Sequence, residues 1–248
     1  AISDLFGWNA VFYFATGVSL LVVLLGGLVI RETHHNHKRD RGPTNLFRDY
    51  SQLLRNPVFI GYALVPAFTS GAFFALAAYS TFLMNDHYRG TSGQYGLYFI
   101  LLTVGFMSGN FISGRLGTRV SSDYMIVFGC LTGIITVELL TLSVLVIPDE
   151  PLALFMPGAL IGLAQGLAMP HAQAAAINSE PNLTGTGSGI VMFLHFSAAA
   201  LASLFISALY DKTFFPMIEV ISVLSVCALI SGLFANASRK KRRISATT

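Results

Sequence analysis

Three ionisable side chains lie well inside long apolar stretches of this sequence, away from the ends, where they could take part in proton chemistry: Glu138, His171 and His195. If such a stretch crosses a membrane, a buried ionisable group is costly and is by default a candidate for function. A neutral imidazole can also gain a proton near pH 7 after a small change in its surroundings. We therefore take Glu138 and His171 as candidates for proton coupling, and His195 as a further candidate carrier.

Each of the three has a plain structural alternative. On a helical wheel Glu138 lies opposite a stripe of small and hydroxylated residues of the kind that helices use for packing, so its carboxyl could simply face outward. His171 follows Pro170, which breaks the helical hydrogen-bond ladder and could turn the imidazole toward an interior cavity. Both histidines could instead be packing residues held by hydrogen bonds. The small stripe comprises Gly129, Thr132, Gly133, Thr136 and Ser143.

A pocket for an amphiphilic molecule is mostly apolar, with a few polar groups that set the orientation of the ligand. One helical stripe carries tyrosine, threonine and phenylalanine, and a later apolar stretch adds two glutamines. With the two histidines they form the predicted lining of a substrate pocket: Tyr62, Thr69, Phe73, Gln165, His171, Gln173 and His195. Glycines at four-residue spacing in the later stretch predict a ridge for close helix packing, at Gly158, Gly162 and Gly166.

No pattern in the sequence indicates an enzyme, a metal site or a bound cofactor. Cys130 and Cys227 lie in apolar stretches, without the spacing of metal or redox motifs. The histidines of residues 34–37 lack a carboxylate partner, which favours a solvated loop over a metal site. The glycines of residues 185–189 lack the lysine of a phosphate-binding loop, which disfavours ATP-driven transport. The net charge of +3 comes without aromatic and basic interleaving, so nucleic-acid binding is not expected.

The elements that must position these residues are membrane-spanning helices. Of the 248 residues, 54% are hydrophobic and only 11% are charged, whereas a soluble domain is about 25% charged. A helix of about 20 apolar residues crosses a bilayer. The stretches are too long, and alternate too little, for the strands of a membrane barrel. Seven spans are predicted, over residues 8–30, 58–84, 94–113, 124–147, 152–177, 187–210 and 214–235.

The basic residues between the spans lie almost entirely on one side of the predicted membrane. Six lie between Arg31 and Arg55, two are Arg115 and Arg119, and five follow within residues 239–243. The other side carries only Arg89 and Lys212. Because loops rich in lysine and arginine stay in the cytoplasm, we expect the first side, with the C-terminus, to be cytoplasmic.

The spacing of the spans predicts one leading helix followed by a six-helix bundle. We interpret residues 1–30 as the last helix of a missing N-terminal half and 31–56 as a basic cytoplasmic central loop. Residues 57–236 are the expected bundle, and 237–248 a basic cytoplasmic tail that could dock on anionic lipid. The chain starts at Ala1 without a methionine or a basic leader, so we expect no signal peptide and about five further spans upstream.

Several short motifs resemble one transporter family. GWNAVFY at residues 7–13 and RETH at 31–34 resemble the start and exit of the sixth span in drug:proton antiporters of the major facilitator superfamily, of the Bcr/CflA type. AMPHA at 168–172, GTGSG at 185–189 and FLHF at 193–196 resemble its tenth and eleventh spans. His171 stands where asparagine is common, and His195 where glutamine is common. GRLGTR at 114–119 is similar to the superfamily's cytoplasmic loop motif, with Thr118 in the usual acidic position and with Gly114, Arg115, Gly117 and Arg119 in place.

The resemblance implies an all-α, polytopic membrane protein with the major facilitator fold. Such a fold has two six-helix halves, each built of two inverted three-helix repeats, with substrate bound between the halves near the bilayer midplane. It further implies alternating-access efflux of drug-like compounds in exchange for protons, in a bacterial cytoplasmic membrane, and hence multidrug and antibiotic resistance. The partners would be a small-molecule substrate, protons, the lipid bilayer and the missing half. Alternatives on the same scaffold are an exporter of a sugar or amino acid, or a membrane sensor or scaffold that does not transport.

Overall fold

The predicted spans are helices in the computed structural model, which describes residues 8–29, 43–117 and 119–245. The described residues form eight α-helices and one short 3₁₀ helix, without a strand. Six of the helices are long and apolar enough to cross a membrane. The elements are α2 (Trp8–Val29), α3 (Pro43–Arg55), α4 (Pro57–Asp86), α5 (Ser92–Leu116), α6 (Ser122–Val146), α7 (Pro151–Ile177), η1 (Pro181–Leu183), α8 (Thr184–Ala208) and α9 (Phe215–Ser245).

Local sequence explains where two of the helices begin. Asn56 precedes α4, and its side-chain oxygen accepts a hydrogen bond from the Val58 N–H at 3.0 Å. Pro57 occupies the first turn, where its missing N–H costs nothing. Before α5, Thr91 and Gln94 form a reciprocal capping box. These caps satisfy backbone donors that a helix leaves unpaired at its start.

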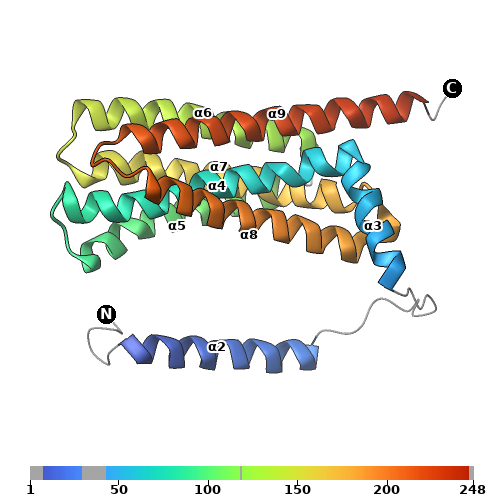
Figure 1. The fold of residues 1–248 in the computed structure, drawn as a ribbon, viewed down its shortest axis with the longest axis horizontal. Coiled ribbons are helices and arrows are strands. Elements are labelled where there is room, and N and C mark those ends of the chain that lie inside the picture. The colour runs from blue at the N-terminus through green and yellow to red at the C-terminus, as the bar shows by residue number, and fades with distance from the viewer. Residues whose placement is uncertain (1–7, 30–42, 118, 246–248) are drawn as a thin grey trace. The chain divides into compact units, whose positions relative to one another are not determined.

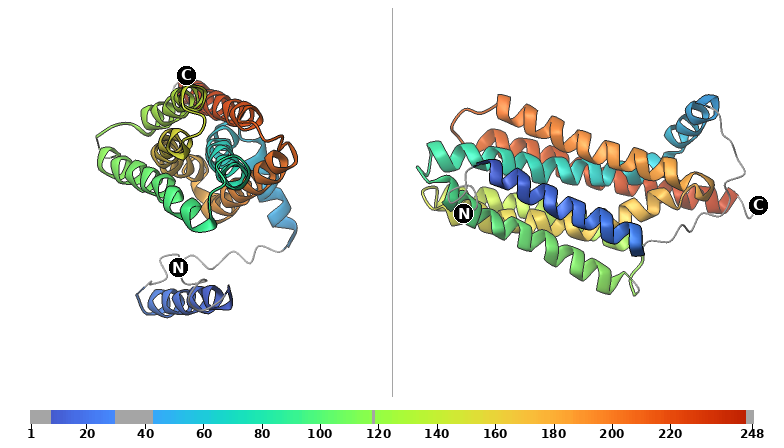
Figure 2. Two further views of the ribbon diagram at one scale, coloured as in Figure 1. Left: turned by 90° about the vertical axis from the view of Figure 1, so that its left-hand side faces the viewer. Right: turned by 90° about the horizontal axis from the view of Figure 1, so that it is seen from below.

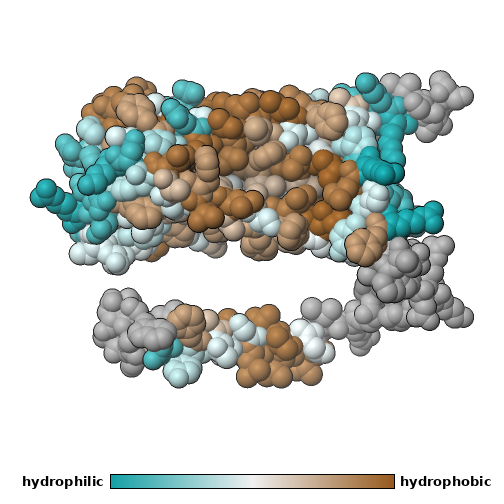
Figure 3. Space-filling view, in the orientation of Figure 1, coloured by the Kyte–Doolittle hydropathy of each residue, from teal (hydrophilic) through white to brown (hydrophobic). Residues whose placement is uncertain are grey.

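The chain divides into two units, residues 1–46 and 47–248. Within the first, α2 has an apolar segment from Phe12 to Leu28, and the Thr16 and Ser19 hydroxyls donate to carbonyls one turn earlier. The second unit contains the six long helices and most of α3. Figure 3 shows apolar side chains over the middle of this bundle and polar ones toward its two ends. The prediction of an all-α polytopic fold is confirmed.

The six long helices pack as two interlocked groups of three (Figure 1). Helices α5 and α6 of the first group lie against α7, the first helix of the second group. Helices α8 and α9 of the second group lie in the same way against α4, the first helix of the first group. The view along the bundle in Figure 2 places α4 and α7 inside the other four. This exchange is the arrangement expected of two inverted three-helix repeats.

Small residues permit the closest of these contacts. A Cβ atom added to Gly162 would lie 2.5 Å from the Leu102 carbonyl oxygen, and one added to Gly166 would lie 2.5 Å from the Phe106 carbonyl oxygen. Two glycines of the predicted ridge on α7 therefore pack directly on the backbone of α5, whereas an added Cβ atom at Gly158 would meet the Leu76 side chain at 3.1 Å. From the other side, Gly105 of α5 meets the backbone of α7 even more closely. Only glycine allows two helix backbones to approach in this way.

The two ends of the bundle differ in charge. The basic end is where α4, α6 and α8 begin and where α5, α7 and α9 end; among its described residues are Arg115, Arg119, Arg239, Lys240, Lys241 and Arg242. The opposite end carries Arg89 and Lys212. Helix α9 continues through the basic residues as far as Ser245, so the segment interpreted as a separate tail extends the last helix by about two turns.

The opposite end is closed by a small hydrogen-bonded cluster. The Tyr79 hydroxyl of α4 donates to the Thr213 carbonyl oxygen at 2.7 Å and lies 3.3 Å from an Asp211 carboxylate oxygen. Hydrogen bonds from the Thr213 side chain and backbone lower the pKa of the Asp211 carboxyl.

Candidate functional site

A chain of three polar side chains crosses the apolar interior of the bundle. The Gln165 amide of α7 donates to the Ser70 hydroxyl of α4 at 2.8 Å, and that hydroxyl lies 2.7 Å from Nδ1 of His195 on α8. The three residues are 4%, 0% and 6% exposed. They join both inner helices to α8, and we call them the central triad.

The hydrogen bonds of the central triad depend on the protonation of the imidazole. Because the Gln165 amide nitrogen can only donate, the Ser70 oxygen accepts that bond, and it can either donate its own hydrogen to His195 or accept a second bond from it. When Ser70 donates, Nδ1 of His195 is an acceptor and the neutral ring carries its proton on Nε2. Protonation of Nδ1 would reverse the bond to Ser70. The central triad therefore has two arrangements that differ by one proton.

The interior beside the central triad is closely packed. Gln165 and Thr69 border a cavity of about 10 Å³, which is roughly the space of one water molecule. The Thr69 hydroxyl donates to the Val65 carbonyl oxygen at 3.0 Å. An organic substrate does not fit inside the bundle at this point. Thr69, Gln165 and His195 could therefore contact a substrate only from the outer surface of the bundle.

Tyr62 lies near the basic end and not beside the central triad. Its ring is 1% exposed, and its hydroxyl donates to the Asp123 carboxylate of α6 at 2.6 Å. The Asp123 carboxylate also pairs with Arg239 of α9, whose guanidinium carbon lies 5.7 Å from the centre of the Tyr62 ring. Tyr62 thus belongs to a partly buried charge cluster that no motif in the sequence had indicated.

Phe73 and Gln173 are half-buried, unlike the residues of the central triad. The Phe73 ring packs against the rings of Phe99 and Phe106, with centroids 6.4 Å apart in both pairs. The amide nitrogen of Gln173 is buried and has no hydrogen-bond partner among the described residues. A buried donor without a partner is rare in a folded protein, so this amide is a candidate for contact with a ligand or another segment.

His171 lies at the basic end, beside the loop that resembles the superfamily motif. Its Nδ1 atom is 3.4 Å from the Ser122 hydroxyl, and a Cβ atom on Gly117 would lie 2.9 Å from its ring. The sequence suggested an interior cavity for this imidazole, whereas the structure packs it on the turn between α5 and α6. Its Nε2 atom is buried without a partner among the described residues.

The rest of the loop motif is partly exposed. The Arg115 guanidinium lies over the Phe111 ring, 4.5 Å from its centroid, and Gly114 has open space around its Cα. The Arg119 N–H donates to the Leu116 carbonyl oxygen at 2.8 Å, which closes the turn. Thr118 lies outside the described residues.

Glu138 faces outward from α6. It is exposed, as are its neighbours Ile135, Leu139 and Leu142 on the same helix. The small stripe on the other side of α6 is in contact with α7, where a Cβ atom on Gly129 would lie 2.8 Å from the Ala168 backbone nitrogen. The helical-wheel interpretation of this span is therefore confirmed, and Glu138 is far from the packed interior.

Parts of the predicted central loop and of the sequence motifs lie outside the described residues. Among the described residues, no group of three or more histidine, cysteine or acidic side chains is placed to hold a metal ion. The histidines of residues 34–37, the RETH motif at 31–34 and Gly7 lie outside the described residues.

Comparison with known proteins identifies the family. A sequence model of the Major Facilitator Superfamily matches residues 1–203. The chain belongs to the major facilitator superfamily. This membership agrees with the six long apolar helices and with their interlocked packing, and it places the chain among membrane transport proteins rather than enzymes.

Two curated members of the superfamily are similar to this chain. The Bicyclomycin resistance protein homolog of Haemophilus influenzae is 23% identical over 248 residues, which is 98% of this chain and 61% of that protein. The Uncharacterized MFS-type transporter YdgK of Bacillus subtilis is 25% identical over 224 residues, which is 88% of this chain and 54% of that protein. The chain thus spans little more than half the length of these superfamily relatives.

Sequence reasoning missed several residues that the structure makes important. Ser70 lies one turn after Pro66 on the stripe that was expected to line a pocket, and a hydroxyl in an apolar span could have drawn attention to it. Asp123 and Glu180 stand near the starts of α6 and α8, where an acidic residue is common because it favours the helix dipole. Their arginine partners come from more than 60 residues away in sequence, which no local pattern reveals.

Proposed function

We propose that this chain is the C-terminal half of a secondary active transporter that exports small amphiphilic compounds in exchange for protons. The observation that carries the proposal is the six-helix bundle of two interlocked repeats in a chain of the major facilitator superfamily. In such a transporter two bundles rock against each other around a substrate site between them. The name of the Haemophilus influenzae relative refers to resistance to bicyclomycin, which supports a drug-like substrate.

The charge distribution supports one orientation in a bacterial inner membrane. The basic end carries nearly all the lysines and arginines of the described bundle. Because basic loops are retained on the cytoplasmic side, the basic end and the C-terminus face the cytoplasm. A first six-helix half, upstream of most of this chain, completes the substrate site.

Exposure within the bundle divides the candidate lining residues into two groups. Phe73, His171 and Gln173 are half-buried, and two of them carry buried nitrogen atoms that have no hydrogen-bond partner in the described part of the chain. These three can contact a substrate directly. Tyr62, Thr69, Gln165 and His195 are buried within the bundle, and they support the site from behind.

The energy source is tested by transport into inverted membrane vesicles that contain the full-length transporter. An imposed proton gradient should drive accumulation of bicyclomycin or a cationic dye, and a protonophore should abolish it. Accumulation that survives the loss of the gradient would show that transport is not coupled to protons. Transport of a sugar or amino acid, with no transport of amphiphiles, would refute the substrate class.

The central triad gives a sharper test of coupling within this half. Glutamine can keep a hydrogen bond to Ser70 but cannot bind a proton, so His195→Gln should lower gradient-driven transport about tenfold, the size of a typical coupling between two sites. Substrate exchange without a gradient should persist. If His195→Gln keeps full gradient-driven transport, the proton is carried elsewhere, at His171 or in the first half.

Glu138 provides the contrasting substitution. Because its side chain faces outward from α6, Glu138→Gln should change gradient-driven transport by less than about twofold, well below a coupling effect. A loss comparable to that of His195→Gln would instead assign proton coupling to Glu138. Both variants are measured in the same vesicles, with protein amounts matched by quantitative blotting.

A further inference from the structure

The basic end contains a cavity that no part of the proposed transport cycle uses. Its volume is about 380 Å³. It lies among the start of α4, the start of α6, the end of α7 and the last turns of α9. Its polar lining comprises Ser122, Asn178, Ser179, Arg239 and Arg242. Two guanidinium groups and an amide make this a cavity rich in hydrogen-bond donors.

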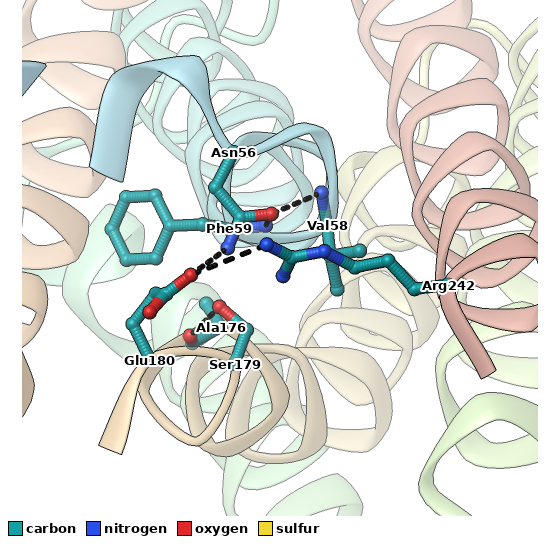
Figure 4. Close-up of polar contacts among 7 residues, drawn as sticks. All are labelled: Asn56, Val58, Phe59, Ala176, Ser179, Glu180 and Arg242. Atoms are coloured by element: carbon teal, nitrogen blue, oxygen red, sulfur yellow. Dashed lines mark hydrogen bonds and ion pairs between the residues drawn. The ribbon is translucent and has the colours of Figure 1, made fainter. Parts of the chain in front are cut away.

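Partly buried carboxylates pair with the two arginines. Glu180 lies 3.5 Å from the Arg242 guanidinium and accepts a hydrogen bond from the Asn56 amide at 2.9 Å, as Figure 4 shows. Asp123 pairs with Arg239 in the same way and accepts from Tyr62. The side chains of Asp123 and Glu180 are 14% and 19% exposed. Each arginine is thereby fixed to the framework of the bundle.

Both guanidinium groups retain hydrogen-bonding capacity. A guanidinium has five N–H donors in a planar fork, and in each ion pair with a described residue the contact is made through the Nη2 atom. Both arginines line the cavity, so the remaining donors of each fork can serve a bound anion. Arginine held in a fixed orientation is the side chain best suited to bidentate recognition of a phosphate.

The charge around the cavity also favours an anion. Asp123 and Glu180 neutralise Arg239 and Arg242, but Lys240 and Lys241 lie between those arginines on the same turns of α9 and are exposed. At the start of α6, Ser121 makes no side-chain cap, so the first N–H groups of this 25-residue helix stay available near Ser122. A helix start of this kind adds partial positive charge.

The surroundings of the cavity indicate a lipid as the source of the anion. On α6, Tyr124 and Phe128 lie within two turns of Ser122 and are largely exposed. On α9, Leu233 and Phe234 lie at the same end and are about half exposed. These apolar side chains would contact acyl chains in a membrane. A volume of about 380 Å³ is at the small end of the range for ligand pockets, which suits a headgroup and not a whole lipid.

We propose that the basic-end cavity binds the phosphate headgroup of an anionic phospholipid through Arg239 and Arg242. The lipid would tie the end of α9 to the starts of α4 and α6 from the membrane side. The proposal does not depend on the substrate or on proton coupling, so it can fail while the proposed function holds.

Binding is tested with fluorescent phosphatidylglycerol and the full chain in detergent, by anisotropy. Arg242 is the more exposed of the two arginines, with a side chain 58% exposed, so its replacement is the milder change. Arg242→Gln should weaken binding about tenfold, because a charge-assisted hydrogen bond is lost. Arg242→Lys should give an intermediate loss, since lysine keeps the charge but not the fork. Arg89→Gln removes the same charge at the opposite end and should leave binding unchanged.

Three competitors identify the source of the phosphate. Unlabelled phosphatidylglycerol should displace the probe, whereas phosphatidylcholine and millimolar inorganic phosphate should not. Phosphatidylcholine has the same phosphate and acyl chains but no net charge, so equal displacement by it would show that the cavity does not select an anionic headgroup. Displacement by inorganic phosphate would show that the ligand is a free anion and not a lipid. Either result overturns the proposal. If Arg242→Gln and Arg89→Gln weaken lipid binding equally, general charge attraction explains the binding, and this result also overturns the proposal. Thermal unfolding of each variant checks that the bundle is folded.

Discussion

Replacing Gly105 by alanine is expected to force α5 away from α7 and to destabilise the bundle by about 3 kcal/mol, the upper part of the usual cost of overpacking. A Cβ atom at this position would lie 1.9 Å from the carbonyl oxygen of Ala159. That atom belongs to the helix backbone and cannot turn aside as a side chain would. The free energy of unfolding of the full chain in mixed detergent micelles measures the effect.

Gly96 supplies a matched control on the same helix. An added Cβ atom at Gly96 meets nothing within 4 Å, so Gly96→Ala should change the free energy of unfolding by less than about 1 kcal/mol, the size of a helix-propensity difference. If Gly105→Ala and Gly96→Ala are equally stable, α5 and α7 are not in backbone contact, and the packing of the two repeats described above is wrong.

Replacing Arg239 by methionine should destabilise the chain by about 2 kcal/mol. The substitution leaves the partly buried Asp123 carboxylate with a neutral phenol as its remaining hydrogen-bonding partner in this cluster. Breaking a fully buried ion pair costs more, but the Arg239 side chain is 33% exposed and water reduces the effect. Methionine keeps the apolar stem that packs near Tyr62. The measurement is again the free energy of unfolding.

A double substitution separates the ion pair from simple loss of packing. Asn at position 123 removes the charge and can still accept a hydrogen bond from Tyr62, so adding Asp123→Asn to Arg239→Met should recover at least about 1 kcal/mol. The two single losses would then not add. Strictly additive losses would show that Arg239 and Asp123 do not interact, and the cluster at the basic end would have no energetic role.

Several features of this chain could be predicted because they are repeated along the sequence. Long apolar stretches mark spans wherever they lie. The six spans of the bundle were found with boundaries within a few residues of α4 to α9, except that α9 continues to Ser245, beyond the predicted end at residue 235. The helical period placed Glu138 on the outer face of α6 and the glycine ridge of α7 against another helix. In both cases a single helix carries all the information that the prediction needs.

The candidate site was less accessible to the same reasoning. His195 and Gln165 were named as candidates, but Ser70, which joins them, was not. The partners in the central triad lie 95 and 125 residues apart in sequence. Tyr62 was placed on a pocket stripe because of its helical position, whereas a carboxylate from another helix occupies its hydroxyl.

By itself, the sequence determined that this chain forms helices in a membrane, which end is basic and which helix faces can pack closely. Hydropathy, charge and helical period are properties of neighbouring residues, so they can be evaluated without knowing the fold. Only the tertiary structure decided which side chains of different helices meet. The order and tilt of the packed helices determine those side-chain contacts. The central triad and the paired arginines of the basic end arise from that packing alone.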